Sequence, residues 1–202
     1  MPKISIIIPI YDQETEHHKL LDFFHRLNDN DLEIITTTGM NRAHAMNAGA
    51  AKATGNFLWF VHADTIVLNA HIAALKLAVS NHPDCLHYFE LSFQEKGITA
   101  VNSFGANIRS ALFRLPWGDQ AFCLATDIFD DLKGYNESAA YGEDHLLVWK
   151  AHQKKIKLNH IPLAVKTSAR QYKKQGWLNL TTKRQYLWIK QAMPEFLKWL
   201  KT

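Results

Sequence analysis

The sequence predicts a single α/β domain, built on a mostly parallel central sheet with helices on both faces. Two apolar, β-branched segments, 4–10 and 32–37, flank a helical pattern at 15–27, and such a strand–helix–strand unit implies a parallel strand pair. The segment 57–61 is an unbroken apolar run, which is typical of a strand buried on both faces. A chain of 202 residues is long enough for one domain with a sizeable core.

The remaining elements follow from hydrophobic spacing and turn residues. After the first unit, the pattern predicts helices at 41–53, 67–80, 98–114, 127–132 and 143–153, and strands at 85–93, 120–125 and 156–161. The last strand is expected to end at Pro162. A long helical pattern rich in Trp and Leu covers 176–201, with a break or kink expected near Pro194. We therefore expect a main domain at 1–175 and a basic, aromatic helical tail at 176–202 packed on it.

The composition excludes several classes of protein. Hydrophobic residues make up 47% of the chain, within the ordinary globular range. No segment is apolar for long enough to span a bilayer, and the amino terminus lacks the basic-then-apolar layout of a signal peptide. Cys85 and Cys123 lie in separate apolar segments, so we expect two buried reduced thiols rather than a zinc site or a disulfide framework. These features favour a cytoplasmic location.

The net charge of +4 conceals an uneven distribution. From Lys150 onward the chain holds 13 Lys and Arg residues and one acid, Glu195, which gives +12; the preceding 149 residues hold 10 bases and 18 acids, which gives −8. A basic carboxy-terminal part suits an anionic partner such as a phosphorylated substrate, an anionic membrane surface or nucleic acid. A solvated basic helix is the simpler interpretation, and no recognisable nucleic-acid-binding module accompanies it.

Asp64 is the first candidate for chemistry. It follows the buried strand at 57–61 within His62-Ala63-Asp64-Thr65, and ligands bind open α/β sheets beyond the carboxyl ends of their strands. One carboxylate can hold Mg²⁺ or Mn²⁺ jointly with substrate phosphates. A helix cap or turn former before Thr65 is an equally good interpretation of this residue alone.

Glu143 and Asp144 form the second candidate site. Adjacent acids at the start of a helix commonly serve as partners of the helix dipole, and in isolation that interpretation is favoured. The functional alternative needs one carboxylate in a pocket, where it would act as general base on an attacking hydroxyl.

Two further segments combine polar, aromatic and flexible residues. Pro116–Gln120 could cradle a sugar or form an ordinary β-turn. The segment 167–177 offers hydroxyls, cations and aromatics together, which suits a phosphate clamp, although an exposed basic loop has the same composition.

Taken together, and in their order along the chain, these candidate segments resemble those of a family-2 glycosyltransferase with the GT-A fold. More narrowly, they resemble the small bacterial branch whose members are often called radical-SAM/selenodomain-associated transferases. The residues at 42–50 match that branch's Arg-Ala-x-x-Met-Asn-x-Gly-Ala segment. The matching segments cover most of the chain, from near residue 4 to near residue 177: Ile4–Ile10, Asn41–Ala50, Phe60–Thr65, Pro116–Gln120, Gly142–Asp144 and Thr167–Arg170. The combination and its order are specific, whereas each motif alone is not.

The resemblance implies a metal-dependent inverting glycosyltransferase that moves a sugar from a nucleotide-diphosphate donor, a UDP- or GDP-sugar, to an unknown acceptor. Asp64 resembles the metal-binding acid of the family's Asp-x-Asp motif, of which this branch keeps one Asp, and would bind Mg²⁺ or Mn²⁺. Asp144, with Glu143 beside it, resembles the catalytic base that activates the acceptor. The implied nucleotide- and donor-binding residues are Ile10, Tyr11, Glu14, Arg42, Asn47, His62, Asp64, Asp119, Gln120 and Arg170.

One departure from the family pattern lies after the second strand. The family usually has an Asp-Gly-Gly-Ser-type loop there, whose acid contacts the base or ribose, whereas the segment 36–40 is short and has no acid. The alternative function is therefore a catalytically impaired nucleotide-sugar-binding or scaffold protein on the same fold. A nucleotidyltransferase is disfavoured because no Gly-rich phosphate loop with a Lys follows the first strand.

Two interpretations of the tail remain open from the sequence. Its basic residues, together with Trp177, Trp188 and Trp199, suit a peripheral membrane contact near a lipid-linked acceptor. A helix that packs its Trp side chains on the core is the simpler interpretation, and we favour it.

Overall fold

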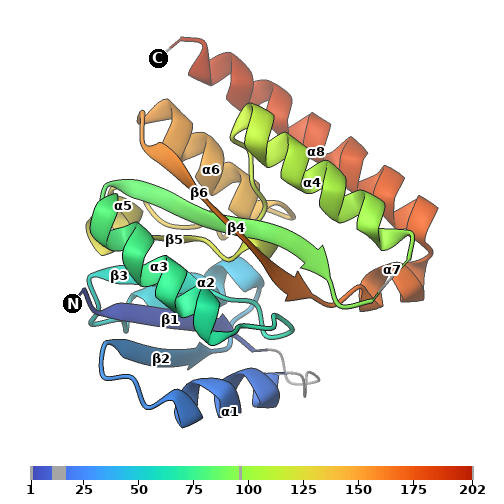
Figure 1. Cartoon of the computed structure of the whole chain (residues 1–202). Coiled ribbons are helices and arrows are strands. Elements are labelled where there is room, and N and C mark those ends of the chain that lie inside the picture. Colours follow the sequence, from blue (N-terminus) through green and yellow to red (C-terminus); the bar gives the residue numbers. More distant parts are fainter. Residues whose placement is uncertain (1, 11–16, 96, 202) are drawn as a thin grey trace.

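The computed structural model describes residues 2–10, 17–95 and 97–201, and it contains a six-stranded sheet (Figure 1). The strands are β1 (Ile4–Pro9), β2 (Leu32–Thr37), β3 (Phe57–Phe60), β4 (Cys85–Phe93), β5 (Cys123–Ala125) and β6 (Lys157–Thr167). Their order in the sheet is β2-β1-β3-β5-β4-β6. β5 runs antiparallel to its neighbours β3 and β4, and the other paired strands are parallel. The predicted α/β domain with a mostly parallel sheet is confirmed.

Helices cover both faces of this sheet, as predicted. They are α1 (His17–Leu27), α2 (Arg42–Ala50), α3 (Asn69–Asn81), α4 (Thr99–Phe113), α5 (Thr126–Asp131), α6 (Glu143–Gln153), α7 (Arg170–Gln175) and α8 (Trp177–Trp199). Figure 1 shows the long α8 running alongside α4 toward the C-terminus. The predicted helical carboxy-terminal end is therefore confirmed.

Two hydrophobic clusters fill the space between the sheet and its helices. On β1, Ile6 joins the cluster beneath α1 and α3, while Ile7 joins the cluster beneath α2, α5 and α6. On β3, Trp59 and Phe60 divide in the same way, and both are almost fully buried. Each such side chain contributes about 1.5–3 kcal/mol by leaving water. Apolar packing on both faces is the reason that these strands are unbroken apolar runs in the sequence.

The predicted end of the last strand is wrong. β6 continues past Pro162 to Thr167, and its register against β4 shifts between Phe89, which pairs with Ile161, and Glu90, which pairs with Ala164. Pro162 therefore lies in a β-bulge, where a residue without an N–H group costs the ladder no hydrogen bond. The longer strand carries the chain to the edge of the sheet where β3 also ends.

The segment predicted as a strand at 120–125 is divided in the structure. Gly118–Gln120 form a short 3₁₀ turn, labelled η1, and strand pairing begins only at Cys123. The backbone N–H of Trp117 donates to the Gln120 side-chain carbonyl at 3.0 Å. This local bond offers the backbone an alternative to the strand ladder, which explains the shortened strand.

The carboxy-terminal helices also differ from the prediction. The basic segment after β6 is not wholly a loop, because α7 forms within it. α8 then runs through Pro194 without the expected break. Pro194 is exposed, so water can satisfy the carbonyl group that its missing N–H leaves without a helical partner.

Cys85 and Cys123 are buried and free, as predicted. Burial raises the pKa of the Cys123 thiol, which keeps it protonated and unreactive at neutral pH. Among the described residues, none of the helices combines the length and apolar character needed to cross a membrane.

His87 on β4 is a buried histidine that makes the fold sensitive to acid. Its side chain is fully buried, Asn159 lies 3.0 Å from its Nδ1 atom, and its Nε2 atom has no hydrogen-bond partner among the described residues. Burial lowers the pKa of His87 to about 4 from an ordinary value of 6.5. The folded state therefore binds a proton less readily than the unfolded chain, and stability is lost as the pH falls from 6.5 to about 4.

We predict that His87→Leu removes most of this pH dependence. The wild-type protein should lose up to about 3 kcal/mol of unfolding free energy between pH 6.5 and pH 4 through this residue, whereas the variant should lose much less. Urea unfolding at the two pH values measures the difference. His25→Leu, on the exposed side of α1, is the matched control, and its unfolding free energy should depend on pH as that of the wild type does. If His87→Leu loses as much stability between the two pH values as the wild type does, His87 is not the source of the acid sensitivity.

Candidate active site

One cleft of about 530 Å³ lies at the edge of the sheet where β1, β3, β4 and β6 end. Pro9, His62, Asp64, Phe93 and Thr167 line it, and each is at or just beyond the carboxyl end of one of these strands. This is the edge at which open α/β sheets place their ligands. The predicted position of Asp64 beyond a strand end is therefore what brings it into a cleft.

Helix ends and the carboxy-terminal helices complete the cleft. Its lining includes Arg42 at the start of α2, the start of α6, and the side of α8 that carries Arg184, Trp188 and Gln191. Gln191 donates to the Tyr141 carbonyl at 2.8 Å, which joins α8 to the loop before α6. The carboxy-terminal helix is thus a wall of the cleft.

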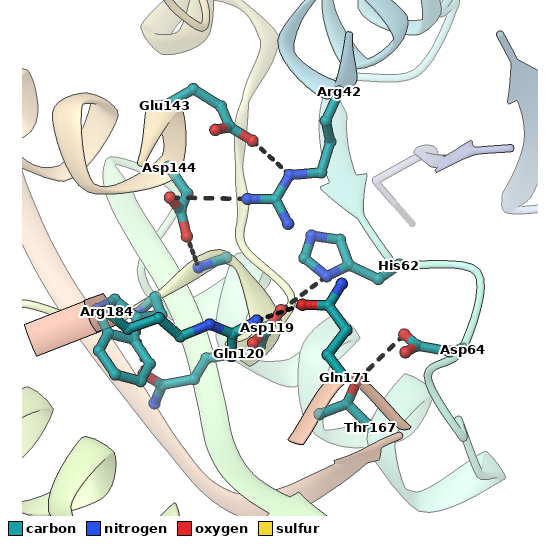
Figure 2. Close-up of polar contacts among 12 residues, drawn as sticks. Arg42, His62, Asp64, Asp119, Gln120, Glu143, Asp144, Thr167, Gln171 and Arg184 are labelled. Atoms are coloured by element: carbon teal, nitrogen blue, oxygen red, sulfur yellow. Dashed lines mark hydrogen bonds and ion pairs between the residues drawn. The ribbon is translucent and has the colours of Figure 1, made fainter. Parts of the chain in front are cut away.

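Asp64 is held on its loop by the end of β6. The Thr167 hydroxyl donates to its carboxylate at 3.1 Å, and the Gln94 side chain donates to its backbone carbonyl at 2.8 Å. The N–H of Ile66 also donates to the Lys166 carbonyl at 2.8 Å, which pins the loop on its other side. Figure 2 shows the Asp64 carboxylate and its bond to Thr167. Asp64 therefore presents its carboxylate from a fixed loop.

Asp144 is fixed at the start of α6 by two glycines. The N–H of Gly118 donates to its Oδ2 atom, and a Cβ at Gly118 would lie 2.9 Å from that atom. Gly142 precedes the helix with a left-handed φ of 62°, and a Cβ there would collide with Gln191 of α8. Both glycines are thus required for Asp144 to face the cleft while α8 packs closely behind it.

Arg42 joins the two acids of α6 (Figure 2). Its Nε atom bonds Glu143, and its Nη2 atom lies 3.9 Å from Asp144 Oδ1. Burial would lower the pKa of Arg42, but Asp144 and Glu143 raise it by more, so the guanidinium is firmly charged. Arg42 thus bonds the Glu143 carboxylate directly and lies farther from that of Asp144.

His62 and Asp119 form a second polar pair between Asp64 and Asp144. Their Nδ1 and Oδ1 atoms are 2.9 Å apart, and both side chains line the cleft. Burial raises the pKa of Asp119, but the hydrogen bond from His62 and the charge of Arg42 lower it by more, so its pKa lies well below the ordinary value. Asp119 is a carboxylate at neutral pH.

The sequence interpretation missed several residues of the cleft. Arg184 on α8 donates to the Tyr172 hydroxyl at 3.0 Å and to the Gln171 side chain, so it stands beside Arg170 at the cleft. The buried Arg109 of α4 lies outside the lining of the cleft and stacks on the ring of Trp117, which does line it, at 3.8 Å from the ring centroid. Such long-range partnerships have no local signal in the sequence, although the density of basic residues after Lys150 pointed to this wall.

Three predicted binding residues do not line the cleft. Gln120 is fully buried, and its amide bonds the Phe89 carbonyl, the Ser110 hydroxyl and the Trp117 N–H. It therefore braces the loop that carries Asp119.

Asn47 and Ile10 are the other two predicted residues outside the lining of the cleft. The Asn47 amide donates to the Tyr135 carbonyl and accepts from the Tyr135 N–H, both at 2.9 Å, so it ties α2 to the chain before α6. Ile10 packs against the cluster beneath α1 and α3, and its N–H donates to the Thr37 carbonyl. The predictions for Tyr11 and Glu14 lie outside the described residues.

The oxygen donors at the cleft suit a hard divalent cation that is shared with a substrate. Among the described residues, no group of three or more His, Cys, Asp and Glu side chains is arranged to hold a metal ion. Mg²⁺, however, is usually held by one or two carboxylates together with substrate phosphates and water. The fixed carboxylate of Asp64, facing an open cleft, fits that mode of binding.

Comparison with solved structures places the fold. TarS from S. aureus superposes with a TM-score of 0.59 and 13% identity, covering 83% of this chain and 37% of that one. TarS 1–349 in complex with UDP-GlcNAc gives a TM-score of 0.59 and 14% identity, over 82% of this chain and 58% of that one. The mannosyltransferase PcManGT from Pyrobaculum calidifontis, in complex with GDP-Man and Mn²⁺, gives a TM-score of 0.59 and 14% identity, over 83% of this chain and 57% of that one.

This chain has the GT-A glycosyltransferase fold. The predicted resemblance is confirmed at that level. The chain spans between 37% and 58% of the length of these structures. No protein-family model and no curated protein sequence matches it. The narrower resemblance to a radical-SAM/selenodomain-associated transferase therefore remains a prediction from the sequence motifs.

We predict that Gln120→Leu destabilises the protein by about 2–4 kcal/mol, because the Phe89 carbonyl and the Trp117 N–H lose their amide partner, whereas Ser110 keeps its bond to the Ala106 carbonyl. Urea unfolding measures the loss. Gln185→Leu, on the exposed side of α8, is the matched control and should change stability little. A variant with wild-type stability would contradict the bracing role and restore Gln120 as a donor-binding candidate.

Proposed function

We propose that the protein is a metal-dependent inverting glycosyltransferase that moves a sugar from a nucleotide-diphosphate donor to an acceptor hydroxyl. The observation that carries this proposal is the meeting of Asp64 and Asp144 in one cleft, with Arg42 and Asp119 between them (Figure 2). A displacement at a sugar carbon needs a cation near the leaving diphosphate and a base on the opposite side, and the cleft offers candidates for both.

The donor diphosphate is assigned to the side of the cleft that carries Asp64. Asp64 would hold Mg²⁺ or Mn²⁺, which when bound neutralises charge developing on the departing diphosphate. Arg170 and Arg184 stand at the same cleft and suit contacts with phosphate oxygens. The solved neighbours that carry UDP-GlcNAc and GDP-Man support a UDP- or GDP-sugar as the donor.

Asp144 is assigned as the general base. Its Oδ2 atom is held by the Gly118 N–H, so the carboxylate keeps a fixed direction at the cleft. As the acceptor oxygen bonds to the sugar carbon, its proton passes to Asp144, and the bond between that carbon and the phosphate oxygen breaks. Attack from the face opposite the leaving group inverts the configuration of the sugar carbon. The nucleoside diphosphate leaves with the bonding electrons.

We predict that Asp144→Asn lowers kcat by about 100- to 10,000-fold while leaving donor binding within a few-fold of the wild type. The assay is release of nucleoside diphosphate from UDP- and GDP-sugars with Mn²⁺, with and without candidate acceptors. Asp84→Asn, in the exposed turn before β4, is the matched control and should keep full activity.

Two outcomes of that assay would change the proposal. An Asp144→Asn variant as active as the wild type would remove Asp144 from its role. A wild-type protein that binds donors without any turnover would favour the alternative, a nucleotide-sugar-binding or scaffold protein, which the absence of an acid at 36–40 motivates.

We predict that Asp64→Asn abolishes the part of donor binding that depends on metal. Titration calorimetry of a UDP- or GDP-sugar with Mn²⁺ should show at least a tenfold weaker Kd than the wild type, whereas the weaker binding without Mn²⁺ should be similar in both proteins. The amide keeps the size of the carboxylate and can still accept from Thr167, so the fold is preserved. Equal Mn²⁺ dependence in the variant and the wild type would rule out Asp64 as the metal ligand.

A further inference from the structure

The helix α4 places its polar side chains inward and its apolar side chains outward. Asn102, Asn107 and Ser110 are buried or half-buried and bond Thr181, the Leu91 backbone and Gln120 respectively. The solvent-facing stripe consists of Val101, Phe104, Ile108 and Leu112, with exposed fractions of 60%, 66%, 41% and 71%. A helix on the surface of a globular protein normally shows the opposite arrangement.

The neighbouring helix α8 exposes a second apolar stripe. At helical spacing, Leu178, Ile189, Met193 and Leu200 are 66%, 52%, 56% and 60% exposed, and Tyr186 and Leu197 lie beside them. The opposite side of the same helix carries Trp188 and Gln191 and lines the cleft. α8 thus has one apolar side in solvent and one side in the candidate active site.

The two stripes form one surface, which we call the outer face. Asn102 of α4 donates to Thr181 of α8 at 3.0 Å, and the Arg109 guanidinium lies 5.5 Å from the ring centroid of Trp188, so side chains of the two helices meet at these two points. They run side by side (Figure 1). On each helix the exposed stripe is rotated about the helix axis, by roughly a quarter turn or slightly more, from the side chains that contact the other helix. Both stripes point away from the sheet, so they face the same way. A contiguous apolar surface of this kind marks an interaction site.

Basic residues border the outer face, and acids are almost absent from it. Lys183 and Lys190, seven residues apart, are exposed along one side of the α8 stripe, and Lys201 follows just beyond the helix. α4 contains no acid. The one acid of α7 and α8 is Glu195, which accepts from Lys198 and Gln153 and points away from the α8 stripe.

We propose that the outer face rests on an anionic membrane surface, with the apolar stripes of α4 and α8 at the boundary of the acyl chains and the lysines among the headgroups. Apolar side chains flanked by lysines are the arrangement that lies in such an interface without crossing it. Pairing of the outer face with a second copy is disfavoured because it would bring the lysines of both copies together. The proposal does not rest on transferase activity.

The tryptophans take no central part in this contact. Trp177 donates to Asn102 and packs near Tyr172, and Trp188 packs against the core beside the cleft. The simpler interpretation of the tail thus holds for these two rings. A contact with lipid instead uses the exposed side chains of the two stripes, four of which lie on α4, outside the tail.

Flotation with lipid vesicles tests the proposal. The wild-type protein should float with vesicles that contain phosphatidylglycerol and much less with vesicles of phosphatidylcholine alone, and added salt should weaken binding. The double variant Phe104→Asp, Ile189→Asp should bind anionic vesicles at least tenfold more weakly. Both positions are already in solvent, so circular dichroism and urea unfolding should show an intact fold.

Matched controls make the test specific. Leu77→Asp changes a residue of α3 that is 63% exposed on the opposite face of the sheet, and it should float like the wild type. Lys183→Glu with Lys190→Glu should reduce flotation, whereas Lys52→Glu, at the exposed end of α2, should not. Sedimentation equilibrium of each protein is measured in parallel.

Two results would overturn the proposal. One is absence of flotation with anionic vesicles in low salt. The other is a concentration-dependent dimer that the Phe104→Asp, Ile189→Asp variant dissociates, together with flotation that this variant leaves unchanged, which would assign the outer face to a second copy. Donor binding measured on the same proteins reports separately on the proposed function.

Discussion

The charge of Arg42 allows several carboxylates to face one cleft. Glu143 and Asp144 are adjacent at the start of α6 and both nearly buried, and Asp119 lies close by. Carboxylates at such short range repel one another unless a cation stands between them. Arg42 supplies that cation, because α2 begins at the edge of the sheet where the strands end. Its pairing is thus a condition for the whole arrangement, including the fixed direction of the Asp144 carboxylate.

The position of Arg42 depends in turn on contacts far along the chain. Asn41 caps α2 by accepting from the His44 N–H and also donates to the Glu137 carbonyl. Asn47, one and a half turns later, bonds both backbone groups of Tyr135. These bonds hold the start of α2 against the segment that leads into α6, so Arg42 and its two acids stay aligned. The Asn residues of this motif thus act on the site through the backbone.

Much of the fold could be predicted from the sequence, because its central strands are buried on both faces and stand out as unbroken apolar runs. Asp64 was singled out for a similar reason, since it follows a strand with a strong apolar pattern, whereas Asp144 was singled out by the resemblance of its motif to those of the family. Residues that meet through tertiary contacts carry no such signal. Arg184 reaches the cleft only because α8 folds back over α6, and Gln120 leaves it only because its amide closes a turn. Because α4 turns apolar side chains outward and polar ones inward, its sequence is only weakly amphipathic. The outer face could therefore not be predicted from the sequence.

The wrong prediction at Pro162 concerns the feature that holds the candidate metal ligand. A proline within an apolar strand usually marks its end, because the ladder loses a donor there. In this sheet a bulge absorbs the proline, and five more residues of strand bring Thr167 to the carboxylate of Asp64. A strand that stopped at Pro162 would leave the loop after β3 without the Lys166 and Thr167 contacts that fix it. The bulge therefore supports the candidate active site, although it lies in the sheet and does not line the cleft.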